Sequence, residues 1–167
     1  MRLSLLPTMI VDAVTDLDPD FLSRQGITLL MLDFDNTIVP YTSDIATERM
    51  DAWLKNMAAS DVQICVVSNS RNDRVKVFCS RYGIPCITHA KKPFTKGIRE
   101  CLHRFQVPAQ QCALAGDQIF TDTIGANNAG VRSILVRAIH NHTIWLKLRH
   151  VAELPFIFAA RKRRVTQ

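Results

Sequence analysis

The sequence lacks an apolar run long enough to cross a membrane. Residues 3–14 are apolar, but Pro7 and Asp12 interrupt them and only Arg2 precedes them, so a secretory signal is not expected. A second apolar stretch, residues 144–160, is too short and too charged for a span, since it contains Lys147, Arg149, Glu153 and Pro155. A cytoplasmic protein is therefore expected, and peripheral contact with the inner face of a membrane stays open.

Cysteine pairs are also missing, because the chain has five cysteines, an odd number, and no CxxC motif. Cys65, Cys86 and Cys112 lie in apolar runs. This placement is typical of small core residues in a reducing compartment and argues against a structural zinc site.

Acidic residues are fewer than basic ones, since the chain has 15 Asp and Glu and 21 Lys and Arg, for a net charge of +6. Such an excess favours acidic partners: phosphate esters, nucleic acid or an anionic membrane surface.

Repeats, low-complexity tracts and internal linkers are absent, so the 167 residues are expected to form a single domain. Apolar runs typical of buried strands alternate with segments of helical periodicity. The strands are expected at residues 27–32, 64–67, 84–88, 112–115 and 131–136. This alternation predicts an α/β fold, a doubly wound parallel five-stranded Rossmann-like sheet covered on both faces. The core is expected at residues 27–136, followed by a C-terminal helix and basic tail at 141–167.

Three helices are predicted in more detail. Residues before the first strand are expected to add a short helix that Asp18 caps and Pro19 begins. A second helix buries the face formed by Met50, Trp53, Leu54 and Met57, which recur at helical spacing. A third helix, after Lys92, is expected to turn five residues inward: Phe94, Ile98, Cys101, Leu102 and Phe105.

Polar side chains follow four successive strands of the predicted sheet. Asp33 and Asp35 follow the first strand, and two residues apart on an extended chain they share one face. The next three strand ends carry Ser68, Lys92, and the pair Asp117 and Asp122. The carboxyl ends of strands in such a sheet gather on one edge, where ligands bind. Carboxylates that meet there can hold a hard cation, attack as a nucleophile or move protons.

These motifs resemble those of the haloacid dehalogenase-like (HAD) hydrolase superfamily, which consists mostly of phosphatases. Its DxDxT motif appears at residues 33–37, its second-motif hydroxyl at Ser68, its lysine at Lys92 before Pro93, and its GDxxxxD motif at residues 116–122. The sequence is similar in particular to the YqeG-type branch, which is related to phosphatidylglycerophosphate phosphatases. The points of likeness are the strings LDFDNT, VVSNS, AKKP and GDQIFTD.

The resemblance implies a role for each of these residues. Asp33 is the implied nucleophile that forms an aspartyl-phosphate, and Asp35 the implied general acid and base. A Mg²⁺ ion is implied at Asp33, at the backbone carbonyl of Asp35 and at Asp117. Phosphate binding is implied for Lys92, for the Ser68 hydroxyl and for backbone amides near Asn69. Asp122 would orient Lys92 or a metal-bound water, and Thr37 with Asn36 would tie the loop together.

The intervals between the motifs leave no room for a cap domain. The residues between Thr37 and the second strand are used by one helix, and those between Ser70 and Lys92 hold only a helix and a strand. An open site suits a phosphate displayed on something large. The expected reaction is therefore hydrolysis of a phosphomonoester, and the branch that the sequence resembles points to phosphatidylglycerophosphate as the substrate.

Several alternatives stay open at this point. The substrate could instead be a phosphoprotein or a nucleotide, and a non-enzymatic phospho-acceptor like a receiver domain also uses an aspartate and magnesium. Asp122 could merely cap a helix, and Lys91 is the neighbouring candidate for the lysine motif. The C-terminal segment, residues 141–167, reads either as a packed helix with a solvated tail or as an anchor on anionic lipid. Nucleic-acid binding is not favoured, because the basic cluster at residues 161–164 lacks interleaved aromatics. The oligomeric state is left undetermined.

Overall fold

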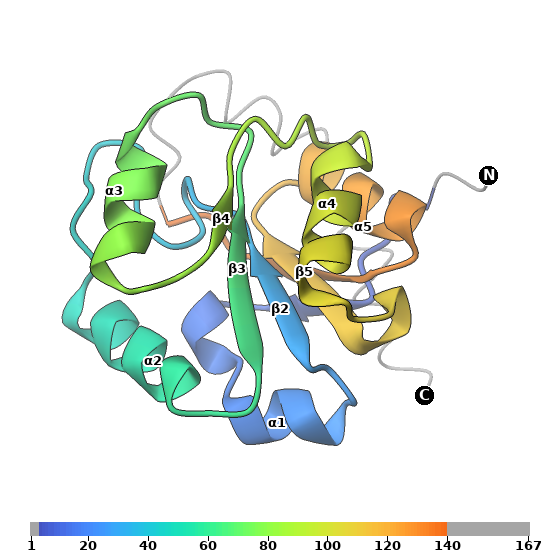
Figure 1. Ribbon diagram of the computed structural model, residues 1–167, viewed down its shortest axis with the longest axis horizontal. Helices are drawn as coiled ribbons and strands as arrows, with labels where there is room; N and C mark the ends of the chain where they lie inside the picture. Colours follow the sequence, from blue (N-terminus) through green and yellow to red (C-terminus); the bar gives the residue numbers. More distant parts are fainter. Residues whose placement is uncertain (1–3, 140–167) are drawn as a thin grey trace.

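A computed structural model describes residues 4–139 of the chain, and helices cover both faces of its central sheet (Figure 1). The sheet has six parallel strands in the order β1-β6-β5-β2-β3-β4. The strands are β1 (Met9–Val11), β2 (Leu29–Leu32), β3 (Gln63–Val67), β4 (Cys86–Ile87), β5 (Cys112–Gly116) and β6 (Arg132–Val136). The helices are α1 (Pro19–Arg24), α2 (Glu48–Ala58), α3 (Arg74–Arg81), α4 (Lys96–Phe105) and α5 (Ile124–Ala129). The predicted doubly wound α/β fold is confirmed.

The strand count differs from the prediction of five, because β1 adds a sixth strand at the edge. It pairs in parallel with β6, with Met9 opposite Ile134 and Val11 opposite Val136. Three residues are too few to show an alternating pattern, and this segment stands more than a hundred residues from its partner strand. Only the assembled sheet makes it a strand, because β6 offers an unpaired edge there.

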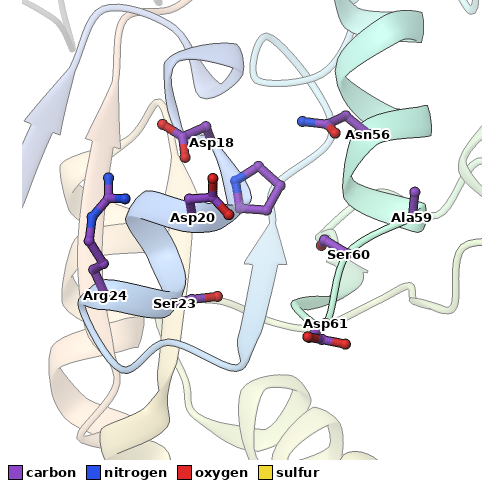
Figure 2. A pocket seen from close by; sticks show the side chains of 9 residues that line it. Asp18, Asp20, Ser23, Arg24, Asn56, Ala59, Ser60 and Asp61 are labelled. Atoms are coloured by element: carbon purple, nitrogen blue, oxygen red, sulfur yellow. The ribbon is translucent and has the colours of Figure 1, made fainter.

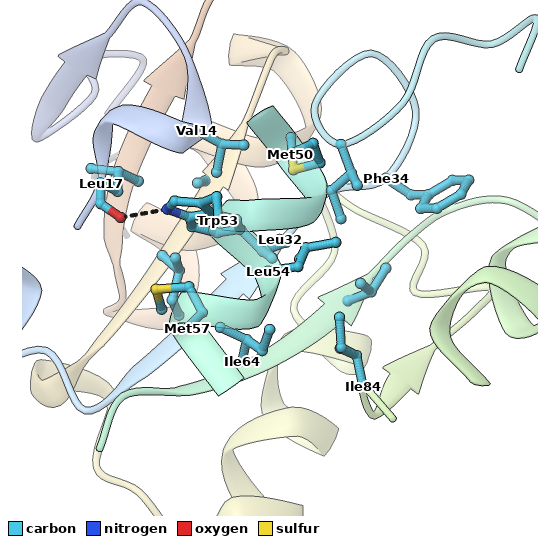
Figure 3. Close-up of a cluster of buried hydrophobic side chains, with 14 of the residues drawn as sticks. Val14, Leu17, Leu32, Phe34, Met50, Trp53, Leu54, Met57, Ile64 and Ile84 are labelled. Atoms are coloured by element: carbon cyan, nitrogen blue, oxygen red, sulfur yellow. Dashed lines mark hydrogen bonds between the residues drawn. The ribbon is translucent and has the colours of Figure 1, made fainter. Parts of the chain in front are cut away.

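The residues of each central strand divide alternately between two hydrophobic clusters. On one face, α1, α2 and α3 pack against Leu30, Leu32 and the residues of neighbouring strands that face the same way. On the other face, α4 and α5 pack against Leu29 and Met31. This is the period of two that a strand buried on both faces requires. Figure 3 shows the first cluster, in which Trp53 donates its indole N–H to the carbonyl of Leu17 at 2.8 Å. The predicted buried face of α2 is confirmed.

The short N-terminal helix is also confirmed, since the Asp18 carboxylate accepts a hydrogen bond from the backbone of Phe21 at 2.7 Å and Pro19 begins α1. The prediction for Phe94 was wrong, because this side chain is 74% exposed. Helix α4 begins only at Lys96, so Phe94 lies in the preceding turn, outside the helical register that buries Ile98.

Among the described residues, no helix is long and apolar enough to cross a membrane. The predicted C-terminal helix and tail, residues 141–167, lie outside the described part.

Candidate active site

Four predicted site residues meet at the carboxyl ends of the central strands. Asp33 directly follows β2, where its backbone N–H still continues the ladder by donating to Ala115 of β5 at 2.9 Å. The Lys92 ammonium reaches across to the Asp33 carboxylate at 2.6 Å and to the Asp122 carboxylate at 2.7 Å. Asp117 follows β5, and an oxygen from each of the three aspartates lies within 4.8 Å of the others. Residues up to 89 positions apart in the sequence thus form one buried cluster.

The charges of this cluster do not balance. Asp33, Asp117 and Asp122 contribute three negative charges when ionised, and Lys92 contributes one positive charge, which leaves a formal charge of −2. Burial makes such an excess costly unless a counter-charge enters. Carboxylate oxygens are the ligands that a hard divalent cation prefers, and three of them lie within 4.8 Å of one another here. The residues present therefore fit a divalent metal.

The electrostatics follow from this crowding. Burial raises the pKa of Asp33 to about 7, although the positive charge of Lys92 opposes the rise, and the charge of Asp122 adds to it. Burial alone would lower the pKa of Lys92, but the carboxylates of Asp122 and Asp33 outweigh it and raise that pKa above its ordinary value. Lys92 therefore stays charged, while Asp33 is held near the point of protonation until a cation joins the cluster.

Two glycines allow the cluster to close. A Cβ at Gly116 would lie 2.4 Å from Cγ and from an oxygen of Asp122, so only glycine lets this carboxylate come under Lys92. A Cβ at Gly97, in α4, would lie 2.6 Å from Cα of Ala90, so the helix can pack directly against the chain that delivers Lys92. Glycine at these positions is thus required by close approach rather than by backbone conformation.

The structure shows the contacts of Asp122 and distinguishes the two neighbouring lysines by their burial. Asp122 lies in the short π-helix η3 (Ile119–Thr123), where one carboxylate oxygen pairs with Lys92 and the other accepts from the backbone N–H of Gln118 at 3.1 Å. It therefore combines a contact to the lysine with a local cap. Lys92 is buried, whereas its neighbour Lys91 is exposed.

The residues predicted to bind phosphate lie beside the cluster. Ser68 follows β3, and its hydroxyl oxygen accepts from the backbone N–H of Ser70 at 3.0 Å, which leaves its O–H available as a donor. The Asn69 side chain is engaged elsewhere, because its amide donates to the Lys92 carbonyl at 2.9 Å and accepts from the Lys92 backbone N–H at 2.7 Å. The Asn69 side chain thus holds the Lys92 segment in place.

Asp35 lies apart from the carboxylate cluster, in a contact that the sequence did not predict. One of its oxygens accepts from the Arg74 guanidinium at 2.9 Å, and both side chains are largely buried. Burial raises the pKa of Asp35, and the positive charge of Arg74 opposes that rise. Nearby, Thr37 is buried, and its backbone N–H donates to the Phe34 carbonyl at 3.4 Å, which closes the turn that contains Asp35.

Two hollows on the protein surface differ in whether predicted site residues line them. A polar hollow of about 530 Å³ lies between α1 and the end of α2 and contains none of the predicted site residues (Figure 2). A more apolar hollow has a volume of about 390 Å³. The residues that line it include Thr37, Ile38, Pro40, Ile45 and Ile139. The second hollow therefore adjoins the loop that carries Asp35.

Comparison with known proteins gives a consistent result. Residues 2–139 match the family described as "Mitochondrial PGP phosphatase". The "Probable phosphatase YqeG" of Bacillus subtilis (strain 168) is 32% identical over 131 residues, which are 78% of this chain and 76% of that protein.

Solved structures resemble the fold at low sequence identity. An uncharacterized protein from Listeria monocytogenes serotype 4b aligns with a TM-score of 0.56 at 17% identity, covering 71% of this chain and 84% of that one. The cobalt-bound form of the deoxy-D-mannose-octulosonate 8-phosphate phosphatase from Haemophilus influenzae aligns with a TM-score of 0.54 at 15% identity, covering 75% of each chain. At these identities the likeness establishes the fold alone.

Proposed function

This chain belongs to the mitochondrial PGP phosphatase family, and on that premise we propose that it hydrolyses a phosphomonoester by covalent catalysis at Asp33. The Asp33 carboxylate attacks phosphorus, and the bond to the leaving oxygen breaks as Asp35 donates a proton to that oxygen. Water then attacks the aspartyl-phosphate, gives its proton to Asp35, and releases phosphate and the Asp33 carboxylate. Each turnover returns both carboxyl groups to their starting state.

The surrounding residues support this chemistry by charge. Lys92 contacts Asp33 at 2.6 Å, so its ammonium lies where a phosphoryl oxygen would arrive beside the nucleophile. The Ser68 O–H and the Asn69 backbone amide are the further donors that we assign to the phosphoryl oxygens. Asp33, Asp117 and the backbone carbonyl of Asp35 would hold Mg²⁺, which when bound offsets the repulsion between carboxylate and phosphate.

For the substrate we propose phosphatidylglycerophosphate, a lipid that displays its phosphate at a membrane surface. The family description supports the choice, and so does an apolar surface beside the site. Tyr41, Ile45, Phe94 and Ile139 are exposed, and all four lie in segments that leave the carboxyl ends of strands. The apolar hollow at Thr37 adjoins the same edge. Peripheral contact with an anionic membrane through this edge would deliver the headgroup to an uncapped site.

The observation that carries the proposed function is the buried contact of Lys92 with Asp33 and Asp122 beside Asp117. Phosphate release with Mg²⁺ tests it, using phosphatidylglycerophosphate in vesicles, a phosphopeptide and a nucleoside monophosphate as substrates. We expect multiple turnovers on the lipid, none with Asp33→Asn and a large loss with Asp35→Asn. Preference for the peptide or the nucleotide would replace the lipid while keeping the chemistry. A stable aspartyl-phosphate without turnover would contradict the proposed hydrolysis.

The membrane contact has its own test, because the chain offers a matched pair of exposed aliphatic residues. Ile45 is 73% exposed at the carboxyl edge of the sheet, and Val77 is 59% exposed on α3. Ile45→Ser should weaken cosedimentation with anionic vesicles and lower the turnover of vesicle-bound lipid, and Val77→Ser should change neither. Equal effects of the two substitutions would contradict docking through this edge.

A further inference from the structure

Arg74, the first residue of α3, makes an unusually complete set of hydrogen bonds. Its Nε–H donates to the Asp44 carboxylate at 2.5 Å. One terminal nitrogen donates to Asp35 Oδ1 at 2.9 Å and to the Tyr41 carbonyl at 3.1 Å. The other donates to the carbonyls of Pro40 at 3.1 Å and Ser43 at 2.8 Å. A guanidinium has five N–H donors, so every donor of Arg74 is used within the protein.

The Arg74 side chain is also largely buried and packed against neighbouring groups, which fixes its position. Its side chain is only 14% exposed, and its guanidinium carbon lies 5.1 Å from the centroid of the Phe34 ring, within cation–π range. A cation at the first turn of a helix needs compensation for the helix dipole, and the acidic N-cap residue of α3, Asp73, pairs with Lys76 rather than with Arg74. The bonds to Asp35, Asp44 and the loop carbonyls supply that compensation.

The contacts have a direct consequence for Asp35. Arginine only donates hydrogen bonds, so Asp35 Oδ1 is held as an acceptor, and a proton carried by this carboxyl group resides on Oδ2. Among the described residues, Oδ1 is the atom of this carboxyl group that accepts a hydrogen bond, and Oδ2 accepts none. The same guanidinium ties residues 40–44 to α3 and so stiffens the chain that continues from Asp35.

We propose that Arg74 is a positioning residue of the phosphatase reaction. It fixes the Asp35 carboxyl group so that Oδ2 is the atom that exchanges a proton with the leaving oxygen. Arg74 itself does not bind the phosphate, since its five donors are engaged with Asp35, Asp44 and three carbonyls. This inference rests on the proposed function, in which Asp35 is the general acid.

Leaving-group dependence separates positioning from a general structural role. The constant kcat/KM counts only the steps up to the first irreversible one, which is formation of the aspartyl-phosphate. An alkyl phosphate needs a proton on its leaving oxygen in that step, whereas 2,4-dinitrophenyl phosphate has a good leaving group and does not. Since general acid catalysis contributes about 10²–10⁴-fold, we expect Arg74→Gln to lower kcat/KM for the alkyl phosphate by about 10–100-fold. The loss on the dinitrophenyl ester should stay below about threefold, because binding and nucleophile are intact.

Two further variants complete the experiment. Asp35→Asn should show the same substrate pattern, and Arg74→Gln in the Asp35→Asn background should cause no further loss on the alkyl phosphate, because the two residues act as a unit. Lys55→Gln, which removes an exposed 2.7 Å ion pair with Asp51 on α2, is the matched control and should leave both substrates unaffected. If Arg74→Gln fails to fold, Arg74→Lys takes its place, since it keeps the charge without the planar fork.

The outcomes are distinguishable from one another. Equal losses on the two substrates, or a double variant far weaker than Asp35→Asn, would overturn the positioning role of Arg74. If Asp35→Asn itself shows no leaving-group dependence, or if Asp33→Asn retains activity, the proposed function fails and not merely the assignment of Arg74.

Discussion

A divalent cation should stabilise the metal-free protein far more at pH 7.5 than at pH 5.5. The reason is the environment of Asp33, since burial, with an added contribution from the charge of Asp122, raises the pKa of this carboxyl group to about 7 although Lys92 opposes the rise. The unfolded chain has its aspartates near the ordinary value of about 3.9. Between these two values the folded protein binds more protons than the unfolded chain, so the stability of the metal-free protein falls as pH rises from about 4 to about 7 and levels off above that.

The magnitudes follow from the same shift. About three pH units at about 1.4 kcal/mol each give about 4 kcal/mol of stability lost by the metal-free protein across this window. A cation at 100 times its dissociation constant at pH 7.5 restores about 2.7 kcal/mol, or about 5–11 °C in Tm for a chain of this size. At pH 5.5 the Asp33 proton must be displaced, which weakens the apparent affinity for the cation roughly 30-fold and leaves a stabilisation of about 1 kcal/mol, or about 2–4 °C in Tm.

Thermal unfolding of the chelator-treated protein, with and without Mg²⁺ at the two pH values, measures these shifts. Asp117→Asn removes one negative charge from the cluster and should abolish most of the Mg²⁺ effect at pH 7.5. Asp61→Asn removes an exposed carboxylate beyond the end of α2 and should change nothing. A shift of equal size at both pH values, or one that survives Asp117→Asn, would refute the electrostatic account of the cluster.

Three other substitutions have definite expected outcomes. Lys92→Met should abolish phosphatase activity and lower the free energy of unfolding in urea by about 3–5 kcal/mol, because it leaves buried carboxylates without their counter-charge; full stability would contradict the ion pairs. Gly116→Ala should lower kcat at least about tenfold, because its Cβ would fall 2.4 Å from Cγ of Asp122, and unchanged kinetics would disprove that contact. Trp53→Phe should cost about 1–3 kcal/mol by leaving the buried Leu17 carbonyl unpaired, while kcat stays normal at temperatures where the variant is folded.

The sequence alone determined the layout of the fold and the residues at its carboxyl edge. Apolar runs buried on both sides and helical spacings are local patterns, so β2, β3, β5 and β6 were predictable to within two residues. All strands of a parallel sheet run in the same direction, so their carboxyl ends lie at one edge whatever the side chains are. Local patterns and chain topology therefore suffice to group Asp33, Lys92, Asp117 and Asp122.

The tertiary structure alone decided which side chains touch, because such contacts depend on rotamers and on packing between distant segments. Strand β1 needed the open edge of β6, and Phe94 turned outward because α4 begins two residues later. Arg74 reaches Asp35 across 39 positions of sequence, a pairing that no local periodicity encodes. Asp122 comes under Lys92 only because Gly116 has no side chain to exclude it. Local physics thus selected the residues of the site, and long-range packing set the distances between them.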